Sequence, residues 1–211
     1  MIPIPTPIYH ITHVGNLAAI LVAGGLKSYT VLRQAGASHT NIAHESIQDR
    51  RAKKRVPCGP GGTLHAYVPF YFAPRPPMLY TLHRGNVTGY TEGQEPIIHM
   101  VSTAQDVVDC GLRFVFTNGH GIMILTDFFD DLSALHQIDW KLMRSRYWAD
   151  TGADQDRCRR RQAEFLVHQF FPWNLVKEIG VMNDQIGAKV RVIIANVAYQ
   201  PLVRVRRGWY Y

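Results

Sequence analysis

The 211-residue sequence lacks long apolar runs. No stretch approaches the roughly eighteen consecutive apolar residues that indicate a membrane-spanning helix. Residues 1–6 also lack the charged start and the apolar stretch of a secretory signal. With 46% hydrophobic and 18% charged residues, the composition is that of an ordinary globular protein. We therefore expect one domain over residues 1–211, soluble in the cytoplasm and not associated with a membrane.

Cysteine is scarce. The three cysteines, Cys58, Cys110 and Cys158, are widely separated and form no C-x-x-C pair. An odd, dispersed set supports neither a disulfide framework nor a cysteine zinc site. His10 and His13 lie three residues apart, but nothing supplies further ligands in a regular pattern. We therefore expect no metal in this protein.

Four familiar signatures are absent: G-x-G-x-x-G, G-x-x-x-x-G-K-[ST], H-E-x-x-H and G-x-S-x-G. Their absence excludes the usual Rossmann and P-loop nucleotide sites, the helix of the zinc peptidases and the nucleophile elbow of the hydrolases. The glycine-rich segment 58–63 reads CGPGGT, but no helix start with a lysine follows it. A plain loop is therefore favoured there over a phosphate-binding cradle.

Positive charge predominates, because 23 lysines and arginines against 16 acidic residues give a net charge of +7. Most of it falls in three clusters, which are Arg50, Arg51, Lys53, Lys54 and Arg55; Arg157, Arg159, Arg160 and Arg161; and Arg204, Arg206 and Arg207. Each cluster alone fits a solvated face as well as a binding site. If the three converge on one face, they form a phosphate-binding surface, and together they favour a polyanionic partner.

The apolar patterns predict short strands mixed with short helices. Strands are expected at residues 8–12, 67–72, 97–101, 114–117, 163–171, around 181, 190–195 and 202–210. Helices are expected at 16–22, from 41 to about 56, from 78 and from 103 to 111. Residues 126–156 show only helical fragments, near 131–135 and 139–144, and indicate a long functional loop. With no repeated β-α-β unit, the mixture predicts an α+β fold.

Three polar features stand out, although each also has an ordinary interpretation. The strand end YHITH at 9–13 holds a histidine of the kind that is often just partly buried and hydrogen-bonded. Arg51 lies in a basic helix, where most arginines are surface charges. Glu164 lies between Arg161 and the apolar Phe165 at the start of a strand, and a carboxylate that is buried there needs a partner.

Five segments of the chain, in this order and at this spacing, resemble the DarT-type DNA ADP-ribosyltransferases, toxins paired with a macrodomain antitoxin called DarG. The segments are IYHITHVGNLAAIL at 8–21, HESIQDRRAKKRV at 44–56, GGTLHAYVPFYFAPRPPMLY at 61–80, FVFTNGH at 114–120 and RRRQAEFLVHQFFPW at 159–173. The third is the most specific. The resemblance implies an ADP-ribosyltransferase fold with central split mixed or antiparallel sheets and short flanking helices. It also implies transfer of ADP-ribose from NAD to a thymidine base in single-stranded DNA, with release of nicotinamide.

The resemblance further implies roles for individual residues. NAD is expected against His10, Ile11, Thr12, Asn16, Leu26 and Arg51, of which Asn16 and Leu26 follow from their position and not from a sharp motif. Arg51 and Glu164 are expected to be catalytic, and segment 114–164 is expected to recognise the substrate. DNA contacts are expected from Tyr71, His120, Arg157 and Arg159. The expected partners are single-stranded DNA and a DarG-like macrodomain, and the protein is expected to be a monomer.

The role of Arg51 has two versions. The family view makes it a proton acceptor toward thymine, yet a guanidinium stays protonated at ordinary pH. Binding the pyrophosphate and positioning the base is an equally sound role. Two other functions remain open: ADP-ribosyl transfer to guanine, RNA or a protein, and a basic nucleic-acid-binding module without turnover.

Overall fold

The computed structural model describes residues 1–36, 40, 42 and 45–211. Its strands are β1 (Pro7–His13), β2 (Gly25–Lys27), β3 (Tyr67–Tyr71), β4 (Ile97–Thr103), β5 (Phe114–Thr117), β6 (Phe128–Phe129), β7 (Glu164–His168), β8 (Phe170–Pro172), β9 (Glu178–Val181) and β10 (Leu202–Val205). Its α-helices are α1 (Leu17–Val22), α2 (Tyr29–Gln34), α3 (Glu45–Lys53), α4 (Pro77–His83), α5 (Ala104–Asp109), α6 (Trp140–Arg144), α7 (Arg157–Arg161) and α8 (Asp184–Ile194). The helix that the sequence predicts from residue 41 thus begins at Glu45, and residues 41, 43 and 44 of that prediction lie outside the described residues.

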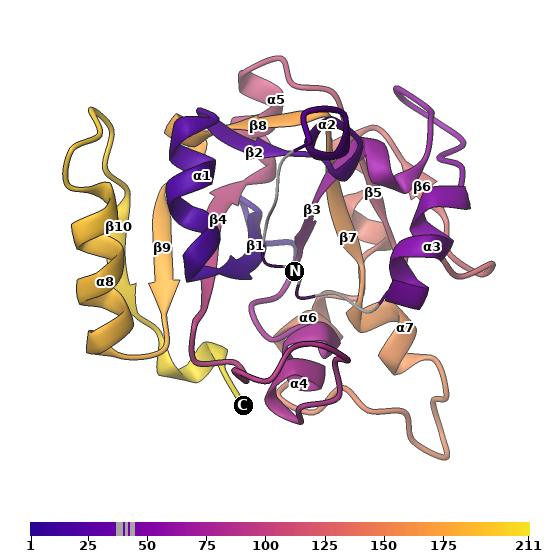
Figure 1. Cartoon of the computed structure of the whole chain (residues 1–211). Helices are drawn as coiled ribbons and strands as arrows, with labels where there is room; N and C mark the ends of the chain where they lie inside the picture. The colour runs from indigo at the N-terminus through magenta and orange to yellow at the C-terminus, as the bar shows by residue number, and fades with distance from the viewer. Residues whose placement is uncertain (37–39, 41, 43–44) are drawn as a thin grey trace.

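Most strands join one large sheet. Eight of them lie in the order β10-β9-β4-β1-β3-β7-β5-β6 (Figure 1). Neighbours run antiparallel except β9 and β10, which pair in parallel. A second, two-stranded sheet pairs β2 with β8. A mixed sheet with short helices between its strands confirms the α+β fold expected from the sequence.

The large sheet is weakly joined in its middle, between β1 and β3. β1 pairs with β4 along its whole length, but its register with β3 is a single pair, Tyr9 with Tyr71. Pro69 of β3 has no N–H to donate to a ladder. Its carbonyl instead accepts a hydrogen bond of 2.8 Å from Nδ1 of His10. A side chain therefore supplements the missing backbone pairing at this boundary, which we call the seam.

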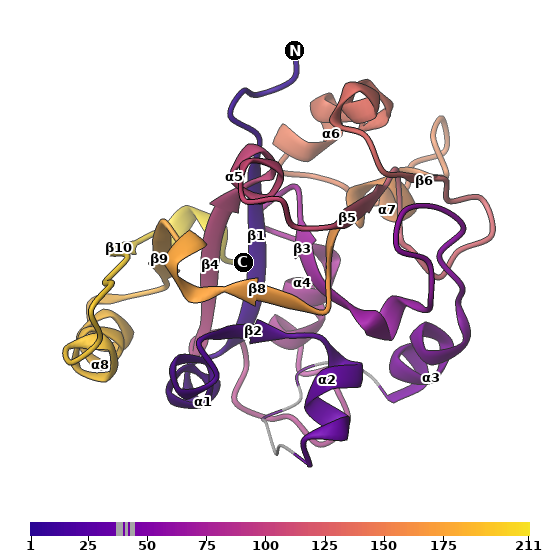
Figure 2. The ribbon, with the colours of Figure 1, turned by 90° about the horizontal axis from the view of Figure 1, so that it is seen from above.

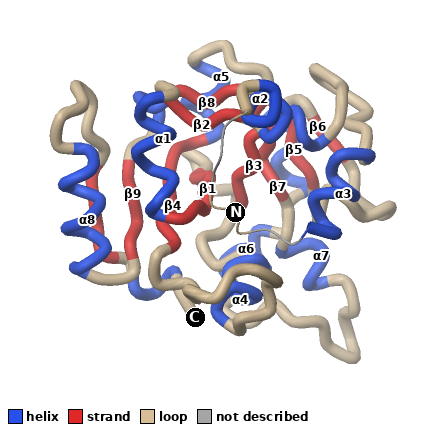
Figure 3. The backbone as a smooth tube through the Cα atoms, viewed as in Figure 1, coloured by secondary structure: helices blue, strands red, loops and turns tan. Residues whose placement is uncertain are grey.

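The remaining elements surround the seam. Figure 2 shows β2 and β8 running across the strands of the large sheet, with α1, α2 and α3 along one side. The small sheet contacts β3 and β7, while α8 packs on β9 and β10. Helices α4, α6 and α7 lie together at the opposite end of the strands in Figure 3. No helix in the described part of the chain is long and apolar enough to cross a membrane.

The core is centred on the strands beyond the seam. The largest fully buried side chains include Tyr67 and Phe70 of β3, Phe116 of β5 and Phe165 of β7. The first four residues of β7 are all buried, so this strand is covered on both faces. Its first residue, Glu164, is therefore held inside the protein and not at a solvated edge.

The prediction of a strand at 190–195 is wrong, because these residues belong largely to α8. The run of β-branched residues suggested a strand, yet Ile186, Val190 and Ile194 are buried at the spacing of one helical face. Asn183 caps the helix, since its side chain accepts a hydrogen bond from the backbone N–H of Ile186. Packing of the apolar face thus overrides the strand preference.

Two other predicted strands are shorter or broken. Residues 202–210 form β10 only as far as Val205 and then a 3-10 turn at Arg207–Trp209. The predicted strand 163–171 divides into β7 and β8 at Gln169, whose φ of 61° lies in the left-handed region. That turn allows β8 to leave the large sheet and pair with β2.

We predict that stability falls as the pH drops from about 6.5 to about 4. His99 is fully buried and hydrogen-bonded to the Pro74 carbonyl, and burial lowers its pKa from 6.5 to about 4; burial lowers the pKa of His10 to about 4 as well. In this window the unfolded chain binds protons that the folded chain does not, which removes roughly 3 kcal/mol of unfolding free energy per histidine. Urea unfolding at pH 7 and 4.5 measures the effect.

His99→Gln should reduce this pH dependence, because glutamine keeps a hydrogen-bond donor but does not titrate. The exposed His136→Gln is the matched control and should leave the dependence as it is in the unmodified protein. An unchanged dependence in His99→Gln would contradict the assignment.

Candidate active site

A cavity of about 290 Å³ opens at the seam. It is lined by side chains from both β1 and β3 and from α1, α2 and α3. All six residues predicted to bind NAD line it, namely His10, Ile11, Thr12, Asn16, Leu26 and Arg51. The cavity therefore occupies the place where the two halves of the large sheet pair least.

The polar groups of the cavity are held in place by neighbours. Burial lowers the pKa of His10 to about 4, so its imidazole is neutral. The side-chain amide of Asn16 donates to Thr12 Oγ1 (3.1 Å) and to the Thr40 carbonyl (3.0 Å), and it accepts the Thr40 N–H (2.8 Å). These groups offer hydrogen bonds without charge, whereas Arg51 brings a positive charge to the wall.

Arg51 and Glu164 form a buried ion pair. Nη1 of Arg51, on α3, lies 2.7 Å from Oε1 of Glu164, the first residue of β7, and the two side chains are only 10% and 4% exposed. The other two polar ends, Arg51 Nη2 and Glu164 Oε2, are buried without a hydrogen-bond partner among the described residues. Such atoms normally find partners. The pair is therefore incomplete by itself and can engage further polar groups.

Tyr71 and Gly121 enclose the carboxylate of Glu164. Tyr71 ends β3 and lies opposite Glu164 in the β3–β7 register. It also lines the cavity, and burial followed by the charge of Glu164 raises the pKa of its hydroxyl. A Cβ atom on Gly121 would lie 2.9 Å from Glu164 Oε2, so the backbone passes directly over the carboxylate. Glu164 thus lies directly behind Tyr71, which forms part of the cavity wall.

His120 precedes that glycine and belongs to the same site. Burial lowers the pKa of its imidazole; the charge of Glu164 opposes this shift and that of Arg51 adds to it. A neutral histidine therefore lies within the electrostatic reach of the ion pair. The structure brings together Tyr71 and His120, two of the four predicted DNA contacts, with the two predicted catalytic residues.

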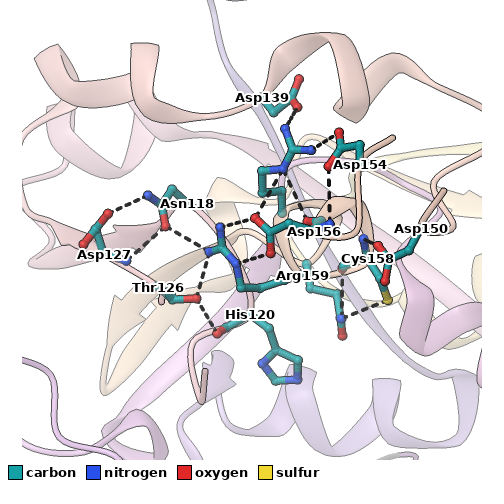
Figure 4. Close-up of polar contacts among 12 residues, drawn as sticks. Asn118, His120, Thr126, Asp127, Asp139, Asp150, Asp154, Asp156, Cys158 and Arg159 are labelled. Carbon is teal, nitrogen blue, oxygen red and sulfur yellow. Dashed lines mark hydrogen bonds and ion pairs between the residues drawn. The ribbon is translucent and has the colours of Figure 1, made fainter. Parts of the chain in front are cut away.

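Arg159 lies next to this turn but is fully engaged within the fold (Figure 4). Its guanidinium donates to both carboxylate oxygens of Asp156 (2.7 and 2.6 Å) and to Thr126 Oγ1 (3.2 Å), and its carbonyl accepts the His120 N–H (3.0 Å). A Cβ on Gly119 would lie 2.3 Å from Arg159 Nη1, so a larger residue there would displace the guanidinium from its present position. The structure thus gives Arg159 the task of holding the turn that carries His120.

The rest of the second basic cluster also forms contacts within the protein, while the DNA contacts expected of Arg157 and Arg159 stay predictions. Arg157 donates to the carbonyls of Ala149 and Tyr147. Arg160 pairs with the acidic residues Asp139, Asp154 and Asp156. Arg161 is 3% exposed and donates to the carbonyls of Arg75, Leu142, Met143 and Ser145. This cluster stabilises the long loop between β6 and β7.

Two of the three arginines of the third cluster are also paired, whereas the exposed residues of the first cluster are not. Arg204 and Arg206 pair with Glu178 at the far edge of the sheet, on β9. By contrast, Arg50, Lys53 and Arg55 are exposed around the end of α3 and form no ion pair within the described part of the chain. Among the three clusters, the first therefore has the most exposed cations without an ion pair in the described part of the chain, and these lie beside Arg51.

Some residues of the site were missed in the sequence. Gln48 lies one helical turn before Arg51 and lines the same cavity, so the helical spacing was a usable signal. His65 also lines it; it is hydrogen-bonded to Gln48 (3.0 Å), and its ring lies tilted against that of Tyr29, with the centroids 4.3 Å apart. No local pattern marked His65. Within the described residues, no group of three His, Cys, Asp or Glu side chains is placed to hold a metal ion.

Comparison with known proteins agrees with this geometry, which suits group transfer from a dinucleotide. The model of the family described as "ssDNA thymidine ADP-ribosyltransferase, DarT" matches residues 9–211. A DNA ADP-ribosyl transferase of Thermus sp. (strain 2.9) is 46% identical, over 99% of this chain and 98% of the relative. One from Escherichia coli O127:H6 is 33% identical, over 97% and 93%.

Solved structures show the same likeness. Thermus sp. 2.9 DarT in complex with ADP-ribosylated ssDNA superposes with a TM-score of 0.92 at 45% identity, covering 99% of this chain and 98% of that one. The same protein in complex with NAD+ gives 0.88 at 43% identity, with both chains fully covered. The chain belongs to the DarT family of ssDNA thymidine ADP-ribosyltransferases. The expected family and the expected reaction are confirmed.

We predict that Arg159→Ala lowers the turnover of DNA modification roughly tenfold or more and also lowers the melting temperature, because Asp156 and Thr126 lose a charged hydrogen-bond partner and Thr126 is the residue that donates to the His120 carbonyl. Modification rates, DNA affinity and thermal unfolding measure this. Arg204→Ala, which also removes a paired arginine but at the far edge of the sheet, is the control. A weaker DNA affinity at unchanged turnover and melting temperature would show instead that Arg159 contacts DNA.

Proposed function

We propose that the chain performs the family reaction with NAD bound in the seam cavity and with Arg51 and Glu164 at the reacting centre. The observation that carries this assignment is the buried Arg51–Glu164 pair, whose atoms Nη2 and Oε2 have no hydrogen-bond partner among the described residues. Two unsatisfied polar atoms behind the wall of a cavity are what a substrate would complete.

The cavity walls support NAD as the occupant. NAD has apolar ring faces as well as hydroxyl and phosphate groups, and the cavity offers apolar side chains from α1 and α2, the neutral His10, the fixed amide of Asn16 and the positive Arg51. The similar Thermus protein binds NAD+. We place the nicotinamide side of NAD near β1 and the negative pyrophosphate within reach of the α3 charges.

The carboxylate of Glu164 has a direct use in the reaction. Breaking the bond between nicotinamide and the ribose C1′ develops positive charge on the sugar. Nicotinamide leaves as a neutral molecule. A buried carboxylate close to the ribose stabilises that charge electrostatically and can accept a hydrogen bond from a ribose hydroxyl. The pyridinium nitrogen takes the electron pair of the broken bond and so becomes neutral, which makes nicotinamide a good leaving group without the help of a metal.

The acceptor is a nitrogen of the thymine ring, which bonds to C1′ and releases its proton to solvent. Arg51 stays protonated, because it is paired with Glu164 at 2.7 Å and a guanidinium does not release its proton in proteins. We therefore assign it to positioning the glutamate and the base. Tyr71 and His120 flank the carboxylate. They are placed to contact the incoming thymine.

We assign binding of the DNA phosphates to the first basic cluster. Arg50, Lys53 and Arg55 are exposed around the end of the helix that supplies Arg51. Phosphates of a strand whose thymine reaches Glu164 would pass these charges. Arg157 and Arg159 support the loop beside them and are not assigned phosphates of their own. We keep two expectations as proposals: a monomer acting in the cytoplasm, and a DarG-like macrodomain antitoxin as its protein partner.

We predict that Glu164→Gln lowers the transfer rate on the order of a hundredfold or more, while NAD affinity changes little. Glutamine keeps the size and the hydrogen-bond acceptor that Arg51 needs but removes the charge that stabilises the transition state. Modification of a thymidine-containing oligonucleotide and calorimetric NAD titration measure the two quantities.

Glu178→Gln is the matched control, because Glu178 is also a largely buried carboxylate paired with arginine, separated from β7 by three strands of the sheet. It should keep its activity. A Glu164→Gln enzyme with nearly full activity would remove Glu164 from the reaction.

We also predict that single-stranded DNA is modified faster than the same strand in a duplex, roughly ten- to a thousandfold, at matched low salt. A base must be unpaired and unstacked before its ring nitrogen reaches the ribose, and this costs a few kcal/mol in a duplex. Affinity alone should not favour the single strand, since duplex DNA has the higher charge density. Modification rates of one thymidine with and without a complementary strand test this; equal rates would exclude the single-strand mechanism.

A further inference from the structure

The loop between β5 and β6 carries an apolar tip that the site described above does not use. Met123, Ile124 and Leu125 are consecutive and exposed, with Ile124 at 93% and Leu125 at 77%. Three apolar side chains in a row on a surface are unfavourable in water unless a partner covers them. We call these three residues the apolar tip.

The base of this loop is closed by hydrogen bonds, so the tip is held in position (Figure 4). Asn118 and Asp127 join its two ends through Nδ2 to Oδ2 (2.9 Å) and through the Asp127 N–H to Oδ1 (3.0 Å). Thr126 Oγ1 donates to the His120 carbonyl (2.9 Å), and the Met123 N–H donates to the same oxygen (2.9 Å). The tip is thus presented by a braced loop.

The residue just before the tip fixes its direction. Ile122 is 7% exposed and belongs to an apolar cluster with Val56, Leu64 and Leu166. The chain therefore leaves the core at Ile122 and returns to it at Thr126, which is buried. Between these two anchors, the side chains of the tip face solvent.

Positive charge lies beside the tip. Lys54 Nζ approaches the Met123 carbonyl (3.4 Å) and lies 5.9 Å from the centre of the Phe128 ring. Lys54 directly follows α3, whose end exposes Arg50 and Lys53. An apolar surface bordered by cations suits a polyanion with apolar faces, which describes single-stranded DNA.

The tip is also near the reacting centre. Gly121 lies over the Glu164 carboxylate, and Ile124 follows it by three residues. Three residues span at most about 10 Å, and successive stacked bases are about 3.4 Å apart. The tip therefore reaches the bases that flank a thymidine bound at Glu164.

We propose that Ile124 and Leu125 form a wedge that packs against the base next to the target thymidine. The wedge breaks the stacking between that base and the thymine. Proteins that distort DNA insert apolar side chains between bases in this way. Separated from its neighbour, the thymine is free to turn its ring nitrogen toward the NAD ribose. This proposal rests on the proposed function and adds the step that presents the base.

The test compares Ile124→Ser/Leu125→Ser with the unmodified enzyme on a single-stranded oligonucleotide that has one thymidine. Loss of the wedge should lower kcat/KM for DNA roughly tenfold or more, because stacking contacts of this kind contribute about that much per base. NAD binding and the melting temperature should stay the same. Val192→Ser, which removes a 75% exposed apolar side chain from α8, is the control.

A second substrate isolates the contact. In an oligonucleotide with abasic sites on both sides of the thymidine, no neighbouring base remains to be separated. The unmodified enzyme and the double variant should then modify it at the same rate, and 2-aminopurine beside the thymidine should brighten on binding only to the unmodified enzyme.

An equal penalty on normal and abasic substrates would overturn the wedge, as would unchanged DNA kinetics accompanied by a change in oligomeric state, which would assign the tip to a second copy of the chain. Absence of any thymidine modification by the unmodified enzyme would instead overturn the proposed function itself, so the two failures are distinguishable.

Discussion

The buried ion pair between Arg51 and Glu164 is the interaction on which the site depends. It joins α3 to the start of β7 across 113 residues of sequence. Two charges taken out of water gain little net stability from each other, and removing either one leaves the other unpaired in the interior. Such a pair therefore adds little to the free energy of unfolding, and folding alone does not require it. The pair lies beside a cavity, with one oxygen and one nitrogen unsatisfied among the described residues, and this supports the catalytic role that we propose for it.

The cavity itself follows from a defect in the large sheet. Pro69 cannot donate to the ladder, and the pairing of β1 with β3 shrinks to the single register pair of Tyr9 and Tyr71. A continuous sheet would leave no room between these strands. Because they part, residues of β1 and β3 can both face one ligand, and Tyr71 can bridge that ligand and Glu164.

Local patterns predicted much of this molecule, and long-range contacts account for the rest. β5 was predicted to the residue, and Glu164 was correctly placed at a strand start, because apolar runs and flanking turns are local signals. The partner of Glu164 could not be read locally, since Arg51 lies in a distant segment. Nor could the engagement of Arg159 by Asp156, and the contact of Arg159 with DNA stays a prediction. In α8, packing overrode the strand preference of its β-branched residues. The family itself came from resemblance.

The seam also bears on how the protein opens locally. With one ladder pair and the His10–Pro69 bond across it, the boundary between β1 and β3 has few backbone hydrogen bonds to break. Regions of this kind open at lower free energy than the whole protein unfolds, and their amides exchange with solvent early. A dinucleotide that touches β1 on one side and β3 on the other would act as a strut between two half-sheets. Binding of the dinucleotide would slow amide exchange in both β1 and β3. The protection of these amides would therefore report whether the cavity is occupied.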